Sequence, residues 1–308
     1  MNPAGGARAM IFGLDGASFQ VLDDLTRRGV MPNLAELMAT GVRGSLLSTV
    51  PPLTPVAWSS LVTGRTPGNH GVTGFFQFDA PESFSLRIVS ARELRSETVW
   101  SIVNRHGLRA GSLNFPIHCP PPRIDGYVIP GWLPWKWIRM FSHPAGLVAK
   151  LQREIPGLDI RELAMDFEQE KKSIAGAAID NHENWIELHI RRDQHWFDVL
   201  CHQLRRDPCE LVGIVFDGVD KLQHLLWPYL DPALEPERPT EGFLRLRERC
   251  WDYFRQLDRF LGEVLAMVGE ECTVFIVSDH GFTGTSQILH INTWLEQNGY
   301  LTWKAGME

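Results

Sequence analysis

The chain has 308 residues, of which 44% are hydrophobic and 22% charged, as in an ordinary globular protein. These proportions exclude disordered and fibrous classes, and the length is sufficient to bury a large core. Thirty Lys and Arg residues against 37 Asp and Glu residues give a net charge of −7, which disfavours broad binding to nucleic acid or to an anionic membrane.

The cysteines and the apolar runs indicate a compartment. The cysteines form no C-x-x-C pair, which indicates reduced thiols rather than a disulfide framework or a cysteine-type zinc site. They are Cys119, Cys201, Cys209, Cys250 and Cys272. The first ten residues do not resemble a secretory signal, and no run approaches 18 apolar residues. We therefore expect a cytoplasmic protein with no membrane-spanning segment.

Strands and helices alternate in the first part of the chain. The apolar run Ala9–Leu14 predicts a buried strand that ends at Asp15-Gly16. Helices are expected after Ser18, at 32–38, at 56–63 and, capped by Ser96, at 97–106; strands are expected at 42–50, 110–115 and 127–130. This alternation is typical of an α/β fold with a doubly wound, mostly parallel sheet and helices on both faces.

The middle of the chain has a different texture. Residues 119–206 are rich in Pro and Trp as far as Pro144 and then predict long helices near 147–154 and 171–204. We interpret 119–206 as an insertion or cap within a single domain that spans 1–308. Buried strands are expected again at 211–216 and 273–277, on either side of a long amphipathic helix at 244–268.

Three of the apolar strands end in acidic residues. Asp15 follows the first strand, Asp217 and Asp220 with His224 follow the second, and Asp279-His280 follow the third. Ligands of open α/β sheets bind outside the carboxyl ends of the strands, so we expect these groups to converge. Singly, an Asp-Gly pair is more often a plain turn, and Asp220 with His224 could be a solvated helix face. Together they favour a metal site, because carboxylate and imidazole ligands suit Zn²⁺ and also Mn²⁺.

Thr54 is the candidate nucleophile. It stands after the break at Pro51-Pro52 and before a predicted helix, where its hydroxyl could face metal ions. Backbone N–H groups at the start of that helix could hold an anion. The alternative is an ordinary helix N-cap, which is a common place for threonine.

Four stretches of the chain carry a resemblance to a known family. They are FGLDG, then T-x-x-x-W-S-S-L-V-T-G-x-x-P-x-N-H-G, then D-x-x-x-H-x-x-W at 220–227, and VSDHGF. In this order and spacing the chain resembles the alkaline phosphatase superfamily, in its type I phosphodiesterase/nucleotide pyrophosphatase and phosphomutase-like branch. The resemblance covers nearly the whole chain, from residue 11 to about residue 300.

The resemblance implies a metal-dependent phosphoric ester hydrolase. Asp15, Asp279 and His280 would hold one divalent cation, with Thr54 bound to it as an alkoxide. Two further ligands, Asp220 and His224, would hold the second cation. Zinc is the expected metal and manganese the alternative. Thr54 would attack the phosphorus atom of a small-molecule phosphate ester to form a phosphothreonine, which water would then hydrolyse. No nucleotide-type cofactor is implied, and the oligomeric state stays open.

Two departures from the family pattern matter. The nucleotide pyrophosphatases carry an Asn 21 residues after the nucleophile, and Phe75 stands there in this chain. The second metal of the family takes another His well downstream of the Ser-Asp-His-Gly stretch, whereas this chain ends 28 residues after His280. His290 is the one candidate substitute ligand in that tail. We therefore expect an incomplete second site or a C-terminally truncated form. The alternatives to hydrolysis are phosphomutase-type transfer and a catalytically defective relative that binds a phosphorylated ligand or a partner.

Overall fold

Alternate side chains of two central strands enter two different cores. The computed structural model describes residues 6–80, 85–166, 168, 170–171 and 179–303. In β1 (Ala9–Leu14), Met10 and Phe12 belong to the larger core, whereas Ile11 packs against a smaller core on the opposite face. The apolar run of β6 (Leu211–Phe216) is divided in the same way. Strands buried on both faces need apolar residues at almost every position, which these two runs supply.

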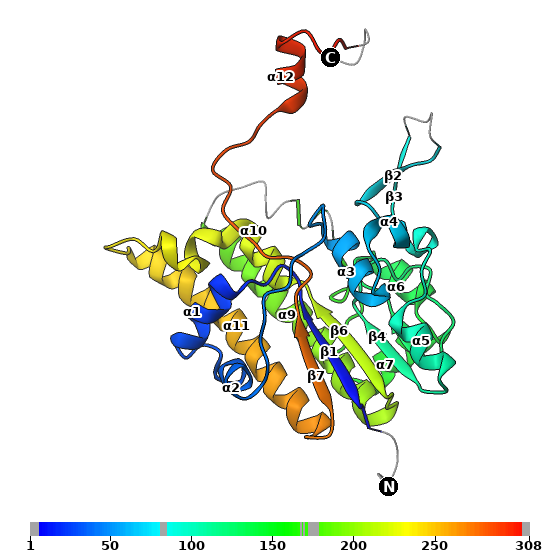
Figure 1. Cartoon of the computed structure of the whole chain (residues 1–308). Helices are drawn as coiled ribbons and strands as arrows, with labels where there is room; N and C mark the ends of the chain where they lie inside the picture. The colour runs from blue at the N-terminus through cyan, green and yellow to red at the C-terminus, as the bar shows by residue number, and fades with distance from the viewer. Residues whose placement is uncertain (1–5, 81–84, 167, 169, 172–178, 304–308) are drawn as a thin grey trace.

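The main sheet has five strands in the order β5-β4-β6-β1-β7, and each neighbouring pair is parallel (Figure 1). The remaining strands of this sheet are β4 (Ala110–Leu113), β5 (Gly126–Ile129) and β7 (Thr273–Val277). A separate antiparallel pair consists of β2 (Phe76–Phe78) and β3 (Leu86–Ile88). The predicted α/β class with a mostly parallel sheet is confirmed.

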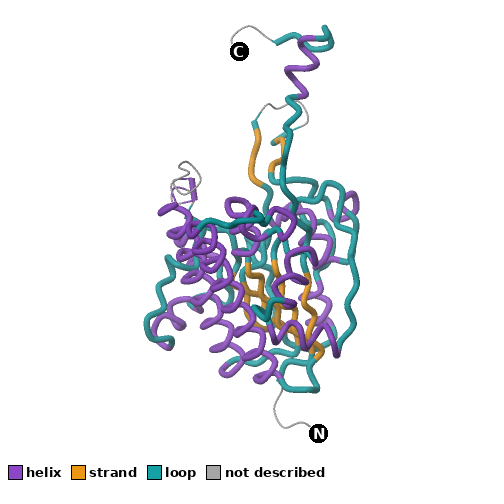
Figure 2. The backbone as a smooth tube through the Cα atoms, turned by 90° about the vertical axis from the view of Figure 1, so that its left-hand side faces the viewer, coloured by secondary structure: helices purple, strands orange, loops and turns teal. Residues whose placement is uncertain are grey.

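Helices cover both faces of the main sheet, as the side view shows (Figure 2). The larger core takes side chains from α1 (Phe19–Arg27), α2 (Pro32–Thr40), α7 (Leu147–Glu154), α9 (Ile179–Arg206), α10 (Gly218–Leu230) and α11 (Glu241–Val268). The opposite core takes them from α3 (Thr54–Thr63) and α5 (Val99–Arg105). The shorter helices are α4 (Pro67–His70), α6 (Trp135–Phe141) and α12 (Ile291–Gln297).

Two glycines let tryptophans lie directly on the sheet. A Cβ atom on Gly13 would stand 2.6 Å from Trp58 of α3, and one on Gly213 would stand 2.6 Å from Trp100 of α5. Both distances are far shorter than a van der Waals contact, so only glycine fits at these positions. The close approach packs α3 directly against β1, and this packing determines where the first residue of α3 lies relative to the sheet.

Some predicted element boundaries need correction. The predicted strand at 42–50 is extended coil, because in the described chain it forms no ladder with another strand. The α5 helix begins later than predicted, and its cap is Thr98, whose hydroxyl accepts from the Ser101 N–H, rather than Ser96. Of the predicted helix at 171–204, residues 172–178 lie outside the described residues, and α9 covers Ile179–Arg206.

The range 119–206, predicted as an insertion or cap, contains part of the main sheet. β5 lies within it and forms one edge of that sheet, paired with β4. Side chains of α9, from the same range, belong to the larger core. The limits of an inserted unit and the single-domain division therefore stay predictions.

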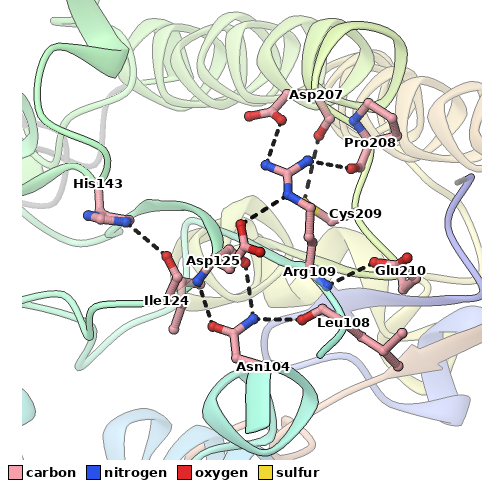
Figure 3. Close-up of polar contacts among 10 residues, drawn as sticks. All are labelled: Asn104, Leu108, Arg109, Ile124, Asp125, His143, Asp207, Pro208, Cys209 and Glu210. Carbon is pink, nitrogen blue, oxygen red and sulfur yellow. Dashed lines mark hydrogen bonds and ion pairs between the residues drawn. The ribbon is translucent and has the colours of Figure 1, made fainter. Parts of the chain in front are cut away.

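Arg109 fastens together the amino ends of three strands (Figure 3). Its guanidinium donates to the Asp207 carboxylate at 2.8 Å, to the Pro208 carbonyl at 2.8 Å and to the Asp125 carboxylate at 3.2 Å. Its backbone N–H donates to the Glu210 carboxylate at 2.8 Å. This network links the segments that enter β4, β5 and β6, at the end of the sheet opposite to Asp15.

The tail from about residue 283 runs away from the sheet and carries α12 at its far end (Figures 1 and 2). Ile288, Leu289 and Tyr300 are exposed along it. All five cysteines are free thiols, as predicted. Among the helices of the described residues, none is both long and apolar enough to cross a bilayer.

Candidate active site

Asp15, Asp279 and His280 meet at the carboxyl edge of the sheet. Asp15 directly follows β1, and Asp279 follows the neighbouring strand β7. The His280 Nε2 atom lies 3.6 Å from Asp15 Oδ1 and 3.4 Å from Asp279 Oδ2. These three side chains each offer a ligand atom within 4.8 Å of the others, and within the described residues no other group of three does so. The structure thus brings together the residues predicted for the first metal.

The hydrogen bonds of His280 indicate which of its ring nitrogens is free. Its Nδ1 lies 2.8 Å from the carbonyl oxygen of Gly281, so Nδ1 carries the proton that is donated to that oxygen. The Nε2 atom is then the ring nitrogen that faces Asp15, Asp279 and Thr54. In metal-binding histidines the ring nitrogen that does not face the metal typically makes such a hydrogen bond, which fixes the tautomer.

The carboxylates at this edge are buried without enough partners. Asp15 is fully buried, and neither of its carboxylate oxygens has a hydrogen-bond partner; Asp279 Oδ2 also has none. Burial, together with the negative charges of Asp279 and Asp220, raises the pKa of Asp15 well above its ordinary value. Burial likewise raises the pKa of Asp279. A divalent cation would supply the missing partner and the countercharge, so these residues fit a metal ion.

Thr54 lies beside the same point. It is the first residue of α3, and Leu53 occupies the N-cap position, so Thr54 is not the cap of its own helix. Its Oγ1 lies 3.1 Å from His280 Nε2. In the tautomer with the proton on Nδ1, the threonine hydroxyl donates this hydrogen bond. The side chain is buried and is turned toward the candidate metal ligands.

The start of α3 offers fewer free anion-binding groups than we predicted. Pro55 has no N–H, and the N–H groups of Val56 and Ala57 donate to the Leu53 carbonyl at 2.9 Å. The N–H groups at the start of α3 would therefore contribute little to binding an anion. A phosphoryl group there would depend more on cations.

Asp220 and His224 stand one helical turn apart on α10. Asp220 Oδ2 lies 3.3 Å from His224 Nε2, and the ring of His224 is largely exposed. Asp220 also touches the Asp15 loop, since a Cβ atom on Gly16 would stand 3.0 Å from Asp220 Oδ1. Gly16 has φ of +67°, a conformation that suits glycine and permits this approach. The predicted second pair of ligands thus lies next to the first set.

Two supporting residues escaped the sequence reasoning. Gln223 is fully buried and its amide donates to the Gly16 carbonyl at 2.9 Å. Ser48 donates to the Asp279 carbonyl at 2.7 Å. No spacing rule marks either residue, because each acts through backbone that only the fold brings near.

Two of the sequence motifs touch each other. The Phe282 ring, from VSDHGF, packs against Trp227 with ring centroids 5.3 Å apart and against His224 at 5.0 Å. Trp227 and His224 both belong to the D-x-x-x-H-x-x-W motif. The aromatic residues therefore hold the segment after His280 against the helix that carries Asp220.

Phe75 and His290 lie differently. Phe75 stacks on Trp132 with centroids 6.3 Å apart, and the Lys221 ammonium lies 5.5 Å from the centre of the same Trp132 ring. The position of the family Asn is thus part of an aromatic stack. His290 is exposed at the start of α12, and the structure does not bring it to Asp220 and His224.

Comparisons with known proteins identify a family and a fold for this chain. The family model for type I phosphodiesterase/nucleotide pyrophosphatase matches residues 9–307. No curated protein matches the chain in sequence. Among solved structures, phosphonoacetate hydrolase from Sinorhizobium meliloti 1021 in complex with phosphonoformate is similar, with a TM-score of 0.56 and 19% identity over 95% of this chain. The same enzyme in complex with phosphonoacetate gives 0.56 and 17% over 96% of this chain.

Murine ectonucleotide pyrophosphatase/phosphodiesterase 5, as an inactive variant in complex with AMP, is similar with a TM-score of 0.49 and 16% identity over 89% of this chain and 57% of its own. This chain spans 62% and 63% of the two phosphonoacetate hydrolase chains. At these identities the likeness to the hydrolase shows an alkaline-phosphatase-like fold.

Proposed function

This chain belongs to the type I phosphodiesterase/nucleotide pyrophosphatase family, and we propose that it hydrolyses small-molecule phosphoric esters through a phosphothreonine on Thr54. One observation carries the proposal. The Thr54 hydroxyl lies 3.1 Å from His280 Nε2, which lies within 3.6 Å of two buried carboxylates, Asp15 and Asp279. A hydroxyl placed against a cation-binding set is the arrangement that an activated nucleophile needs.

We assign two divalent cations to this site. Asp15, Asp279 and His280 would hold the first, next to Thr54, and Asp220 with His224 would hold the second. Zinc fits the carboxylate and imidazole ligands best, and manganese is the alternative. When bound, the cations would lower the pKa of the Thr54 hydroxyl and offset charge on the phosphoryl oxygens.

Thr54 performs the covalent step. Its Oγ1 forms a bond to phosphorus while the bond from phosphorus to the leaving alcohol oxygen breaks, and that alcohol takes a proton from water. The proton of the Thr54 hydroxyl passes to solvent, because His280 Nε2 is engaged as a ligand. A water oxygen then attacks phosphorus, the Thr54 ester bond breaks and Thr54 recovers a proton.

The test measures turnover of p-nitrophenyl phosphate and bis-p-nitrophenyl phosphate with added Zn²⁺ or Mn²⁺. We expect turnover by the wild type, a loss of at least about 100-fold in Thr54→Ala, and a wild-type rate in the control Thr40→Ala, whose exposed hydroxyl donates to the Glu36 carbonyl within α2. Equal rates for wild type and Thr54→Ala would overturn the nucleophile. Absence of turnover by the wild type with either metal would overturn the hydrolase.

The products also test the reaction type. Hydrolysis releases one equivalent of alcohol and, from a monoester, one of inorganic phosphate. Transfer of the phosphoryl group to an added alcohol with little free phosphate would instead mark a phosphomutase-type reaction and contradict the hydrolase.

A further inference from the structure

Two side chains of α9 contact the first turn of α10. Asp217, at the N-cap position of α10, faces Arg192 of α9, with 3.3 Å between Asp217 Oδ2 and Arg192 Nη2. The Lys221 carbonyl accepts a hydrogen bond of 2.9 Å from the indole Nε1 of Trp185, also on α9. Asp220 lies between these two anchored positions. The α9 helix therefore helps to fix the position of the turn that carries Asp220.

The charged groups at this contact are buried. The side chains of Arg192 and Asp217 are 3% and 0% exposed. Glu170 completes the set, 3.8 Å from Arg192 and 3.0 Å from the Lys221 ammonium. Two cations and two carboxylates thus balance one another away from water, and a buried pair of this kind costs a great deal to disrupt.

Asp193 does not compete for the Arg192 guanidinium. Burial and the charge of Asp217 raise the pKa of Asp193 to about 8, so it is largely protonated near neutral pH. Its Oδ2 lies 2.6 Å from the Tyr253 hydroxyl. Burial alone would raise the pKa of Asp217, but the charges of Arg192 and Lys221 more than offset it and keep that pKa below its ordinary value. Asp217 is therefore the ionised partner of Arg192.

The Asp217 side chain points toward Arg192, with which it forms an ion pair but no hydrogen bond. Although Asp217 holds the N-cap position, its side chain makes no capping hydrogen bond to α10. It turns inward, where Asn114 also reaches it with a donor at 3.4 Å. At the next residue, Gly218, a Cβ atom would stand 2.5 Å from the Tyr253 hydroxyl, so the helix start is pressed onto the elements beneath.

We propose that Arg192 is a positioning residue for the second cation, acting through Asp217 on the turn of α10 that carries Asp220 and His224. The inference rests on the proposed two-metal function. Residues that orient metal ligands without touching the ion typically contribute 10- to 100-fold to metal affinity. The effect should fall mainly on the second cation, because Asp15, Asp279 and His280 follow β1 and β7, and the charge of Asp217 acts on Asp15 only as one of several contributions to its pKa.

The experiment titrates Zn²⁺ into the metal-free protein by calorimetry. Wild type should bind two ions, and Asp220→Asn should lose one of them, which identifies the second step. Arg192→Lys keeps the charge but carries it on a shorter side chain that places it farther from Asp217, and it should weaken that step about 10- to 100-fold while the other step changes less than about threefold. The control Arg191→Met, at the neighbouring exposed arginine, should bind both ions as the wild type does.

Milder and more drastic variants keep the test decisive if Arg192→Lys does not fold. The double variant Arg192→Met with Asp217→Asn removes both charges and leaves no lone buried ion. Trp185→Phe removes the hydrogen bond to the Lys221 carbonyl together with part of the buried indole, and it should weaken the second step about 2- to 10-fold.

Two outcomes separate this inference from the proposed function. A wild type that binds fewer than two ions would overturn the two-metal proposal itself. A wild type that binds two, with both steps unchanged in folded Arg192→Lys or in the double variant, would overturn the role of Arg192 alone.

Discussion

Thr54 Oγ1 and His280 Nε2 lie 3.1 Å apart although 226 residues separate them in the chain. The contact depends on two placements. Trp58 packs against Gly13 and places α3 on one face of β1. β7 is the parallel neighbour of β1 within the sheet, so His280 follows it at the same carboxyl edge. A change that moves either element should separate the hydroxyl from the imidazole.

The site should cost stability when no cation is bound. Burial and neighbouring carboxylates raise the pKa of Asp15 above its unfolded value, so the metal-free protein should become less stable as pH rises from about 4 through the folded pKa. Asp15→Asn should therefore raise the Tm of the metal-free protein at neutral pH and abolish the further rise that Zn²⁺ gives to wild type. Thermal unfolding in chelator and in Zn²⁺ checks both effects. A lower Tm for metal-free Asp15→Asn would contradict the repulsion.

Gly13→Ala should disturb both stability and turnover. Its Cβ would stand 2.6 Å from the Trp58 ring and 3.1 Å from the Ile214 carbonyl, and such overpacking costs about 1–3 kcal/mol. Since Trp58 belongs to the helix that Thr54 begins, turnover per folded molecule should fall as well. Urea unfolding and rate assays should show neither effect in Gly44→Ala, where nothing lies within 4 Å of the new Cβ.

Arg109→Met should lower the free energy of unfolding by about 1–3 kcal/mol, because partly buried acceptors at Asp207 and Pro208, one of them charged, lose their donor. Zn²⁺ affinity should not change, since the network lies at the amino ends of the strands, whereas Asp15 and Asp279 follow the carboxyl ends of β1 and β7. The control Arg105→Met removes an exposed ion pair with Glu97 and should cost less than about 1 kcal/mol. A drop in Zn²⁺ affinity for Arg109→Met would show that the two ends of the sheet are coupled.

His118 should make the fold sensitive to acid. Burial lowers its pKa to about 4, whereas the unfolded chain has an ordinary value near 6.5. The unfolded state therefore takes up the proton first, and stability should fall as pH drops below about 6.5, by about 2–3 kcal/mol near pH 4.5. In the double variant His118→Phe with Ser112→Ala, which removes both partners of the 2.8 Å hydrogen bond, this part of the pH dependence should vanish. An unchanged pH profile would mean that His118 is charged in the fold.

The strands could be predicted where the chain alone determines burial. The runs 211–216 and 273–277 were bounded correctly, because unbroken apolar stretches flanked by polar residues have one good use in an α/β sheet. The segment 42–50 is less apolar, with Arg43, Gly44 and Ser45 near its start, and it is coil that pairs with no strand in the described residues.

The candidate site divides in the same way. Asp15, Asp279 and His280 could be predicted to meet because they follow parallel strands, whose carboxyl ends share an edge. Gln223 and Arg192 could not, because their roles depend on how α10 and α9 pack on that edge. Neither lies at a spacing that any motif records.

β7 ends the sheet, and in the described residues only its β1 side is paired. Phe275 is half exposed on this strand, and Leu46 and Leu47 are exposed on the nearby coil. An unpaired strand edge flanked by apolar side chains is a template for pairing between molecules. Asp279 and His280 follow the carboxyl end of this strand. Self-association along β7 would therefore make the geometry of the candidate site depend on the concentration of the protein.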